Sequence, residues 1–157
     1  MMILYNQYQV MKSLVIFDSQ YGNTERVARI IAQTLKTKAV HVSQVTSADL
    51  EGLGLLVIGS PVQAGNATMA IQKYINQISD EDVKSLQFAT FDTRIEMFIA
   101  KIFGYAADRV AKKLKRKGAK IISTPGAFIV KDKEGPLADG ELERAAEWSQ
   151  SLLEQNK

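Results

Sequence analysis

The sequence predicts one α/β domain, built as a doubly wound, five-stranded parallel sheet with helices on both faces. Two observations lead to this fold class. Apolar strand-like runs alternate with segments of helical period along the whole chain, and most of these runs are continuously apolar, as in strands buried on both faces. A third observation sets the strand order. The second strand alternates apolar and polar residues, which suits a sheet edge, so we expect the order 2-1-3-4-5.

The elements follow one another in a regular series. Residues 14–17 are all apolar and predict a first strand that ends at Asp18. From Thr24 the period changes to that of a helix with one apolar side. The second strand is predicted at residues 40–43 and the third at 53–58. Further helices are predicted at residues 71–78, 106–114 (ending near Gly118) and 142–153, and further strands at 88–91 and 121–130, the last interrupted at Pro125-Gly126.

The domain is expected to span residues 11–157, with residues 1–10 as an N-terminal arm. That arm carries no charge and no small-residue cleavage site, so it does not resemble a signal peptide. No apolar run approaches the roughly 20 residues of a membrane span. We therefore expect a cytoplasmic protein without a membrane span.

Composition excludes several kinds of site. The chain has no cysteine, which removes thiolate nucleophiles, disulfides and cysteine-ligated metal centres. His41 is the one histidine and cannot form a histidine metal cluster; it is expected to be an exposed strand residue. The net charge of +3 is spread along the chain, well short of the basic stripe that nucleic-acid binding requires.

The loop after the first strand has the composition of a phosphate site. It consists of Asp18-Ser19-Gln20-Tyr21-Gly22-Asn23-Thr24-Glu25 and leads directly into a helix. Glycine lets the backbone direct several N–H groups toward one point, and the helix N-terminus adds partial positive charge. The loop has no lysine and no dinucleotide-binding glycine pattern, which favours a single phosphate monoester. The alternative is a loop that only caps the helix.

Residues 19–25 resemble the FMN phosphate loop of the flavodoxin family. Residues 59–65, Gly-Ser-Pro-Val-Gln-Ala-Gly, are similar to the flavodoxin loop that wraps the flavin ring, and residues 91–94, Phe-Asp-Thr-Arg, stand at the third flavin loop. Trp148 lies where many flavodoxins carry a tryptophan on the last helix, although we expect it to be a packing anchor. The resemblance covers residues 11–155. It implies a flavodoxin-like fold, bound FMN and one-electron transfer between redox partner proteins.

The resemblance also implies a set of binding residues. Hydroxyls and backbone N–H groups of the first loop would surround the phosphate, the second loop would pass along the ribityl chain and ring, and the third loop would meet the pyrimidine end. The FMN site predicted in this way comprises Ser19, Gln20, Tyr21, Gly22, Asn23, Thr24, Ser60, Pro61, Val62, Gln63, Ala64, Gly65, Asp92, Thr93 and Arg94. Arg94 is expected beside the pyrimidine end of the flavin; the alternative is that its side chain points to solvent or pairs with Asp92 or Glu96.

The chain departs from the family pattern in three ways, each with a consequence. Its second loop has no aromatic residue to stack on the flavin, so Phe98, Phe103 or Tyr105 is expected either to supply one or to belong to the core or to a homodimer seam in residues 95–105. The apolar residues 95–103 are expected to cover the ring or to form that seam. The third loop runs on into that apolar stretch. Flavodoxins are typically acidic and this chain is basic, with a group of cations in residues 112–120, which favours acidic partners or a solvated face.

Two other functions remain open at the level of sequence. One is a small FMN-dependent NAD(P)H:quinone reductase, since relatives with a Tyr-Gly pair in the phosphate loop include such enzymes. The other is a flavin-free interaction domain that keeps the fold. The turn at residues 133–137 has no predicted function.

Overall fold

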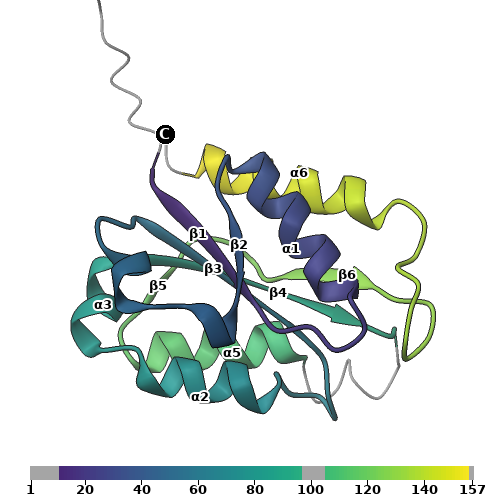
Figure 1. The fold of residues 1–157 in the computed structure, drawn as a ribbon, viewed down its shortest axis with the longest axis horizontal. Helices are drawn as coiled ribbons and strands as arrows, with labels where there is room; N and C mark the ends of the chain where they lie inside the picture. Colours follow the sequence, from purple (N-terminus) through teal and green to yellow (C-terminus); the bar gives the residue numbers. More distant parts are fainter. Residues whose placement is uncertain (1–10, 97–104, 156–157) are drawn as a thin grey trace, which may run out of the picture.

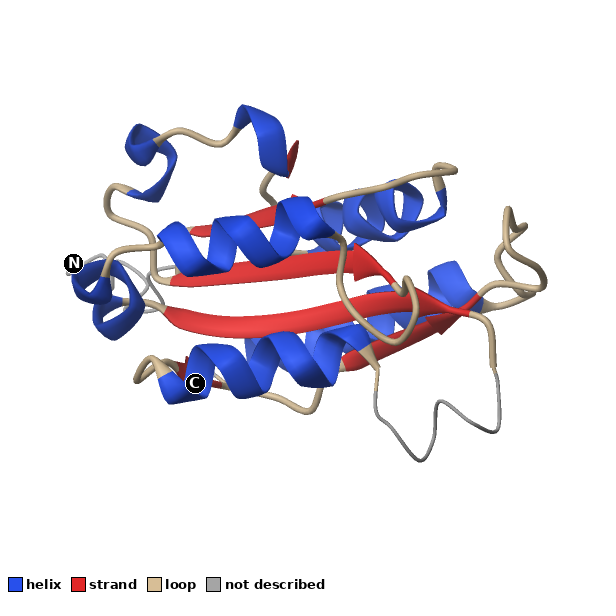
Figure 2. Cartoon of the chain, turned by 90° about the horizontal axis from the view of Figure 1, so that it is seen from below, coloured by secondary structure: helices blue, strands red, loops and turns tan. Residues whose placement is uncertain are grey.

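The computed structural model describes residues 11–96 and 105–155, which form a twisted parallel sheet between two layers of helices (Figure 1, Figure 2). The strands are β1 (Ser13–Phe17), β2 (Ala39–His41), β3 (Leu55–Pro61), β4 (Gln87–Arg94), β5 (Lys120–Ile121) and β6 (Gly126–Ile129). All pairings are parallel, in the order β2-β1-β3-β4-β5, and β6 also pairs with β4. The predicted order is confirmed.

The last predicted strand is divided into two pieces. β5 pairs with the beginning of β4 and β6 with its end, and the chain leaves the sheet between them around Pro125. Proline has no N–H group to donate to a sheet, so a break at this position follows from the sequence.

Two pairs of helices cover the sheet. Helices α1 (Asn23–Thr34) and α6 (Glu141–Glu154) pack on one face, and α2 (Met69–Gln77) and α5 (Ala106–Arg116) pack on the other (Figure 1). The predicted helix at 71–78 is followed by a further short helix, α3 (Asp80–Ser85), which begins at a Ser79 cap. Two 3₁₀ turns, Val42–Gln44 and Ser47–Leu50, follow β2.

Side chains alternate strictly between the two faces of the sheet. In β1, Leu14 and Ile16 belong to the core under α2 and α5, whereas Val15 and Phe17 belong to the core under α1 and α6. The same alternation holds in β4, where Phe88 faces the first core and Phe91 the second. The position of a residue in its strand therefore decides which face of the sheet its side chain lies on.

The structure can be compared with the expected environments of two single residues, His41 and Trp148. His41 is a strand residue, as expected, at the end of β2, but it is half-buried rather than exposed: its Nε2 lies 3.0 Å from Asp18 Oδ1, and its ring meets that of Phe17 edge-on. Trp148 is the expected packing anchor, with its ring centroid 6.2 Å from that of Phe91 and 6.1 Å from that of Phe128.

Parts of the expected apolar stretch, including Phe98 and Phe103, lie outside the described residues. Within residues 11–96 and 105–155, no helix is both long enough and apolar enough to cross a membrane.

Candidate functional site

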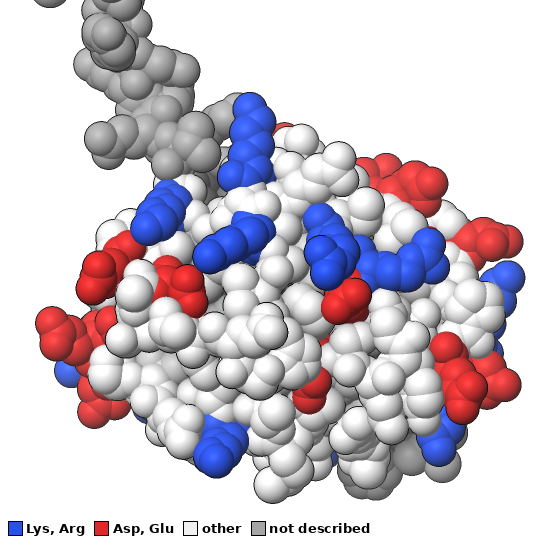
Figure 3. Space-filling model, viewed as in Figure 1, with Lys and Arg blue, Asp and Glu red and all other residues white. Residues whose placement is uncertain are grey.

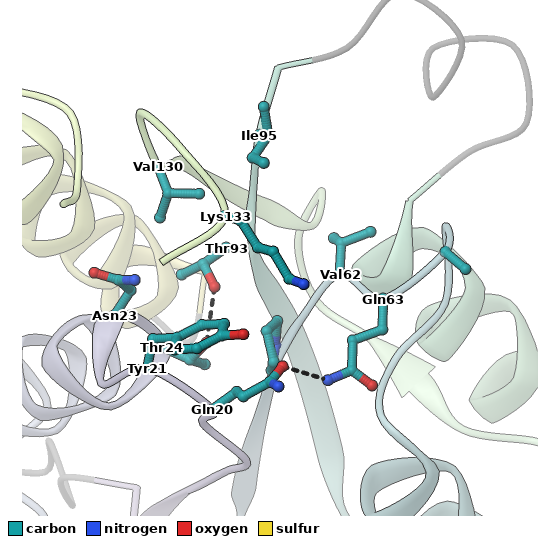
Figure 4. Close-up of a pocket in the computed structure, with 12 residues that line it drawn as sticks. Gln20, Tyr21, Asn23, Thr24, Val62, Gln63, Thr93, Ile95, Val130 and Lys133 are labelled. Atoms are coloured by element: carbon teal, nitrogen blue, oxygen red, sulfur yellow. Dashed lines mark hydrogen bonds between the residues drawn. The ribbon is translucent and has the colours of Figure 1, made fainter. Parts of the chain in front are cut away.

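A pocket of about 480 Å³ lies at the carboxyl ends of the strands, beside the point where the chain leaves β1 for one face of the sheet and β3 for the other (Figure 4). This is where ligands bind in open parallel sheets. Its volume is within the range of small-molecule sites. It is lined by Gln20, Tyr21, Asn23, Thr24, Pro61, Val62, Gln63, Ala64, Thr93, Ile95, Val130 and Lys133.

Nine of the fifteen residues predicted from the sequence line this pocket. They come from all three predicted loops: Gln20, Tyr21, Asn23, Thr24, Pro61, Val62, Gln63, Ala64 and Thr93. Of the other six, Ser19, Gly22, Ser60 and Gly65 shape the loops. Asp92 and Arg94 lie apart from the pocket.

The phosphate loop is organised around the Ser19 hydroxyl. Its oxygen accepts hydrogen bonds from the backbone N–H groups of Gly22, at 3.1 Å, and Glu25, at 3.3 Å. Gly22 is the N-cap of α1 with φ +93°, and nothing lies within 4 Å of where its Cβ would be. The N–H groups of Asn23 and Thr24 have no acceptor among the described residues. An anion seated there would meet two free donors and the positive end of a 12-residue helix.

The second loop forms a tight turn at residues 63–66, which we call the Gln63 turn and which contacts the first loop. Gln63 and Asn66 exchange backbone hydrogen bonds of 2.8 and 2.9 Å across Ala64 and Gly65, whose φ angles are 49° and 80°. Gln63 Nε2 donates to Gln20 Oε1 at 2.9 Å and so joins the two loops across the pocket (Figure 4).

Ser60 supports this turn from beneath. Its side chain is buried, and its hydroxyl accepts from the N–H of Thr68 at 3.0 Å, tying the end of β3 to the start of α2.

Asp92 and Arg94 form a buried ion pair on the opposite face of the sheet. The guanidinium donates twice to the Asp92 carboxylate, at 2.7 and 2.8 Å, and the N–H of Ala107 at the start of α5 donates to it at 2.8 Å. Burial raises the pKa of Asp92, and the hydrogen bonds from Arg94 oppose that rise. Because side chains alternate along β4, Thr93 faces the pocket while the residues on either side of it do not.

Among the described lining residues the one aromatic side chain is that of Tyr21, which is 41% exposed. Tyr105, one of the expected stacking residues, is buried instead, and the Arg94 guanidinium lies over its ring at 3.3 Å from the centroid. Its face toward Arg94 is therefore already covered.

Sequence reasoning missed two lining residues, Val130 and Lys133, whereas Ile95 begins the stretch that was expected to cover the ring or form a dimer seam. Val130 and Lys133 belong to the connection between β6 and α6, which also contacts the phosphate loop, since Asn23 Nδ2 donates to the backbone oxygen of Glu134 at 3.1 Å. The sequence carried a signal for this connection. All strands of a parallel sheet end at one edge, so the loop after the last strand opens onto the same site as the others.

The pocket is nearly neutral, because among its described lining residues Lys133 alone carries a formal charge. The surrounding surface is mixed. Figure 3 shows Lys and Arg side chains in a row across the upper part of the view, where Figure 1 shows α1 and α6, with acidic side chains to either side. The donors that face the pocket are thus hydroxyls, amides, free backbone N–H groups and one ammonium.

Comparison with known families gives this geometry its context. The family model described as Flavodoxin matches residues 15–148, which include all three loops. This chain belongs to the flavodoxin family. Flavodoxin-family proteins bind a flavin, typically FMN, and transfer electrons to redox partners.

The individual proteins to which this chain is similar are distant from it in sequence. The uncharacterized protein MJ0298 of Methanocaldococcus jannaschii is 27% identical over 155 residues, covering 91% of this chain and 99% of the relative. A solved flavodoxin from the domain Archaea has a TM-score of 0.73 at 16% identity, covering 92% of this chain and 98% of that one. Oxidised flavodoxin 1 from Bacillus cereus has a TM-score of 0.72 at 17% identity, covering 91% and 97% of the two chains. These structures share the flavodoxin fold.

The residues present fit FMN. The free donors at the start of α1 suit a phosphate, and the pocket between Tyr21, Val62 and Thr93 has room beside them for a ring system. The open space at Gly22 would let a phosphate approach the backbone closely.

Proposed function

We propose that this protein binds FMN in the pocket between the phosphate loop, the Gln63 turn and the end of β4, and that it carries single electrons between redox partner proteins. Bound FMN supplies the one-electron chemistry. The protein binds and orients the cofactor and sets the electrostatics around it.

One observation carries this proposal: the free N–H groups of Asn23 and Thr24 stand at a helix N-terminus that opens into the pocket. Two unsatisfied donors beside a cavity at the carboxyl edge of the sheet are a site for a small anionic group attached to a larger body. A flavin mononucleotide has that form, with one phosphate at the end of a flexible chain.

The test is direct binding. Purified protein is incubated with FMN and desalted, and its visible absorption spectrum is recorded; we expect near-stoichiometric flavin. Titrations with FMN and riboflavin should then differ by about a hundredfold or more in Kd, because charge-assisted hydrogen bonds contribute about 1.5–3 kcal/mol each. Equal Kd values would contradict a phosphate site, and a colourless protein would favour the flavin-free interaction domain.

A variant of the loop sharpens this test. Ser19→Ala removes the oxygen that holds the N–H groups of Gly22 and Glu25 in place, so it should weaken FMN binding more than riboflavin binding. Ser47→Ala, on a 3₁₀ turn that does not line the pocket, is the control and should change neither Kd.

We further propose that the partners are acidic. A groove of about 390 Å³ lies between α2 and α5, and four cations line it: Arg109, Lys112, Lys113 and Arg116. It adjoins the flavin pocket, because Arg109 donates to Asn66 Oδ1 at 2.7 Å and Asn66 closes the Gln63 turn. Complementary charge mainly accelerates association and is screened by salt.

Small electron acceptors of opposite charge can report this field. Reduced protein should react faster with anionic ferricyanide in the wild type than in a Lys112→Gln/Lys113→Gln variant at low salt. With cationic hexaammineruthenium(III), the same substitutions should have the opposite effect. Rates that change in the same direction for both acceptors would contradict an electrostatic role for the groove.

A further inference from the structure

We propose that Lys133 is the cation that faces the bound cofactor and that it favours the reduced, negatively charged form of the flavin ring. This inference rests on the proposed function. Lys133 lies on a loop for which the sequence predicted no function. It takes the role of a cation beside the flavin that the family resemblance implied for Arg94.

Lys133 is held over the pocket by a firmly closed loop. The connection from Lys131 to Ala138 is closed by three backbone hydrogen bonds: Lys131 N–H to Pro136 O and Gly135 N–H to Asp132 O, both 2.9 Å, and Ala138 N–H to Ile129 O, 2.8 Å. We call residues 131–138 the strap.

The strap lies directly against the phosphate loop. Asn23 Nδ2 donates to the backbone oxygen of Glu134 at 3.1 Å. A Cβ on Gly135 would come within 2.7 Å of the Asn23 side chain, so the two loops touch without space between them. The backbone position of Lys133 is therefore coupled to the loop that would hold the phosphate.

The ammonium of Lys133 is available to a ligand. It forms no ion pair with any carboxylate in the described part of the chain, whereas Lys131 on the same strap pairs with Asp139 at 3.6 Å and Arg94 pairs with Asp92 at 2.7 Å. Figure 4 shows the Lys133 side chain extending into the pocket, with its nitrogen toward the side lined by Val62 and Gln63 and away from Asn23.

That orientation places the charge on the ring side of the pocket. In the proposed complex the phosphate occupies the start of α1, and the ring lies along the loop after β3. Full reduction of the flavin takes two electrons from redox partners and one proton from solvent, so the charge of the ring falls by one. A nearby ammonium attracts this added charge and has little effect on the neutral oxidised ring. Lys133 should therefore increase the affinity for reduced FMN more than for oxidised FMN.

The experiment compares three variants of the full chain loaded with FMN. Lys133→Gln removes the pocket charge, Lys133→Arg keeps it, and Lys131→Gln removes a charge from the same strap outside the pocket lining. Titration gives the Kd for oxidised FMN. The two-electron potentials of free and bound FMN then give the ratio of the Kd values for reduced and oxidised FMN.

We expect Lys133→Gln to weaken binding of reduced FMN about tenfold relative to oxidised FMN, which is a fall of about 30 mV in the two-electron potential. Lys133→Arg should retain most of the wild-type ratio, and Lys131→Gln should leave it unchanged. The shift should shrink at high salt where water reaches the site.

Two results would overturn the inference. The ratio of the two Kd values could be unchanged in Lys133→Gln; if both redox forms of FMN then bound equally more weakly but riboflavin did not, Lys133 would be assigned to the phosphate. Alternatively, the ratio could change equally in Lys131→Gln, which would indicate only the overall charge. Failure of the proposed function is distinguishable from both, because wild-type protein would then retain no FMN.

Discussion

Thr24 and Thr93 share a hydrogen bond of 2.7 Å between their hydroxyl oxygens, with both side chains almost completely buried (Figure 4). The bond joins the first turn of α1 to the end of β4, two elements that are 69 residues apart in the chain. Both residues line the pocket, so this bond fixes the distance between the phosphate loop and the third loop.

Replacing both of these threonines should cost less than the sum of the two single replacements. Thr24→Val keeps the shape but leaves the Thr93 hydroxyl buried without its partner, which we expect to lower the free energy of unfolding by about 1–3 kcal/mol. Thr93→Val should do the same. In the double variant no hydroxyl is left unpaired, so its loss should be smaller than the sum of the two single losses. Urea unfolding of the four proteins measures this coupling, and strict additivity would show that the hydroxyls do not interact.

The buried pair of Asp92 and Arg94 should be sensitive to the loss of its cation. Arg94→Met leaves the Asp92 carboxylate, whose side chain is 0% exposed in the wild type, with the N–H of Ala107 as its one remaining hydrogen-bond donor among the described residues and with the like charge of Asp108 nearby. We expect a destabilisation of about 3–5 kcal/mol at neutral pH. Asp92→Asn combined with Arg94→Met removes both charges and should recover much of this loss. Equal stability of the single and double variants at neutral pH would contradict a charged Asp92.

The pH dependence of the Arg94→Met variant has a definite sign. Burial raises the pKa of Asp92 in the folded protein above its ordinary value, and removal of Arg94 raises it further. A raised folded-state pKa favours folding when the group is protonated, so this contribution is present at low pH and is lost as pH rises through the folded-state pKa. The deficit of Arg94→Met relative to wild type should therefore shrink as pH falls toward the ordinary pKa of an aspartate. Urea unfolding of both proteins across this pH range tests the sign.

The sequence predicted which loop lies in this region, but not which of its side chains reach the pocket. Residues 91–94 do lie at the carboxyl edge of the sheet, as predicted. Which side chains of that segment reach the pocket depends on strand alternation, and alternation becomes informative only when the helices covering each face are known. Because Phe91 packs under α1 and α6, alternation places Thr93 on the pocket side and Asp92 on the side of α5.

Other elements also differ in whether the residue pattern alone predicts them or whether they depend on contacts elsewhere in the fold. The continuous apolar strands and the long amphipathic helices were predictable because burial imposes their periods. Helix α3 was not, because its six residues are mostly polar and its capping serine resembles any turn. Lys133 was missed because the sequence does not show that the strap folds back onto Asn23.

Tyr74 provides a second pH-dependent prediction, on the face of the sheet opposite α1. Its hydroxyl is buried and has no hydrogen-bond partner among the described residues. Desolvation, together with the charges of Asp82 and Asp49, raises the pKa of Tyr74 from 10.0 to about 12. Because the folded-state pKa lies above that of the unfolded chain, the contribution to stability is complete below about pH 10 and is lost as pH rises toward 12.

Tyr74→Phe should remove this alkaline loss without harming the fold. At neutral pH the substitution removes a buried, unpaired hydroxyl, so the free energy of unfolding should stay the same or rise by about 1 kcal/mol. Urea unfolding of both proteins between neutral pH and about pH 11 isolates the effect, since all other tyrosines and lysines are common to the two. Parallel pH profiles would mean that the Tyr74 hydroxyl is solvated.

The contact between the strap and the phosphate loop can be tested at Gly135. Its φ of +105° disfavours any side chain, and a Cβ there would come within 2.7 Å of Asn23 Oδ1 and 2.8 Å of its Nδ2. Gly135→Ala therefore combines backbone strain, of about 1–3 kcal/mol, with a clash that should push the strap away from the phosphate loop. We expect lower stability and at least about tenfold weaker FMN binding, since a displaced loop and cation no longer complete the pocket.

Gly118→Ala separates these two effects, because Gly118 has a similar φ of +96° but nothing within 4 Å of where its Cβ would be, and it lies at the end of α5 away from the pocket lining. This control should lose a comparable amount of stability in urea unfolding and bind FMN as the wild type does. Asn23→Ala combined with Gly135→Ala removes the clash but keeps the strain, so part of the stability lost in Gly135→Ala should return. If Gly135→Ala and Gly118→Ala bound FMN equally well, the strap would have no part in the site, and the position of Lys133 over the pocket would have no consequence for the cofactor.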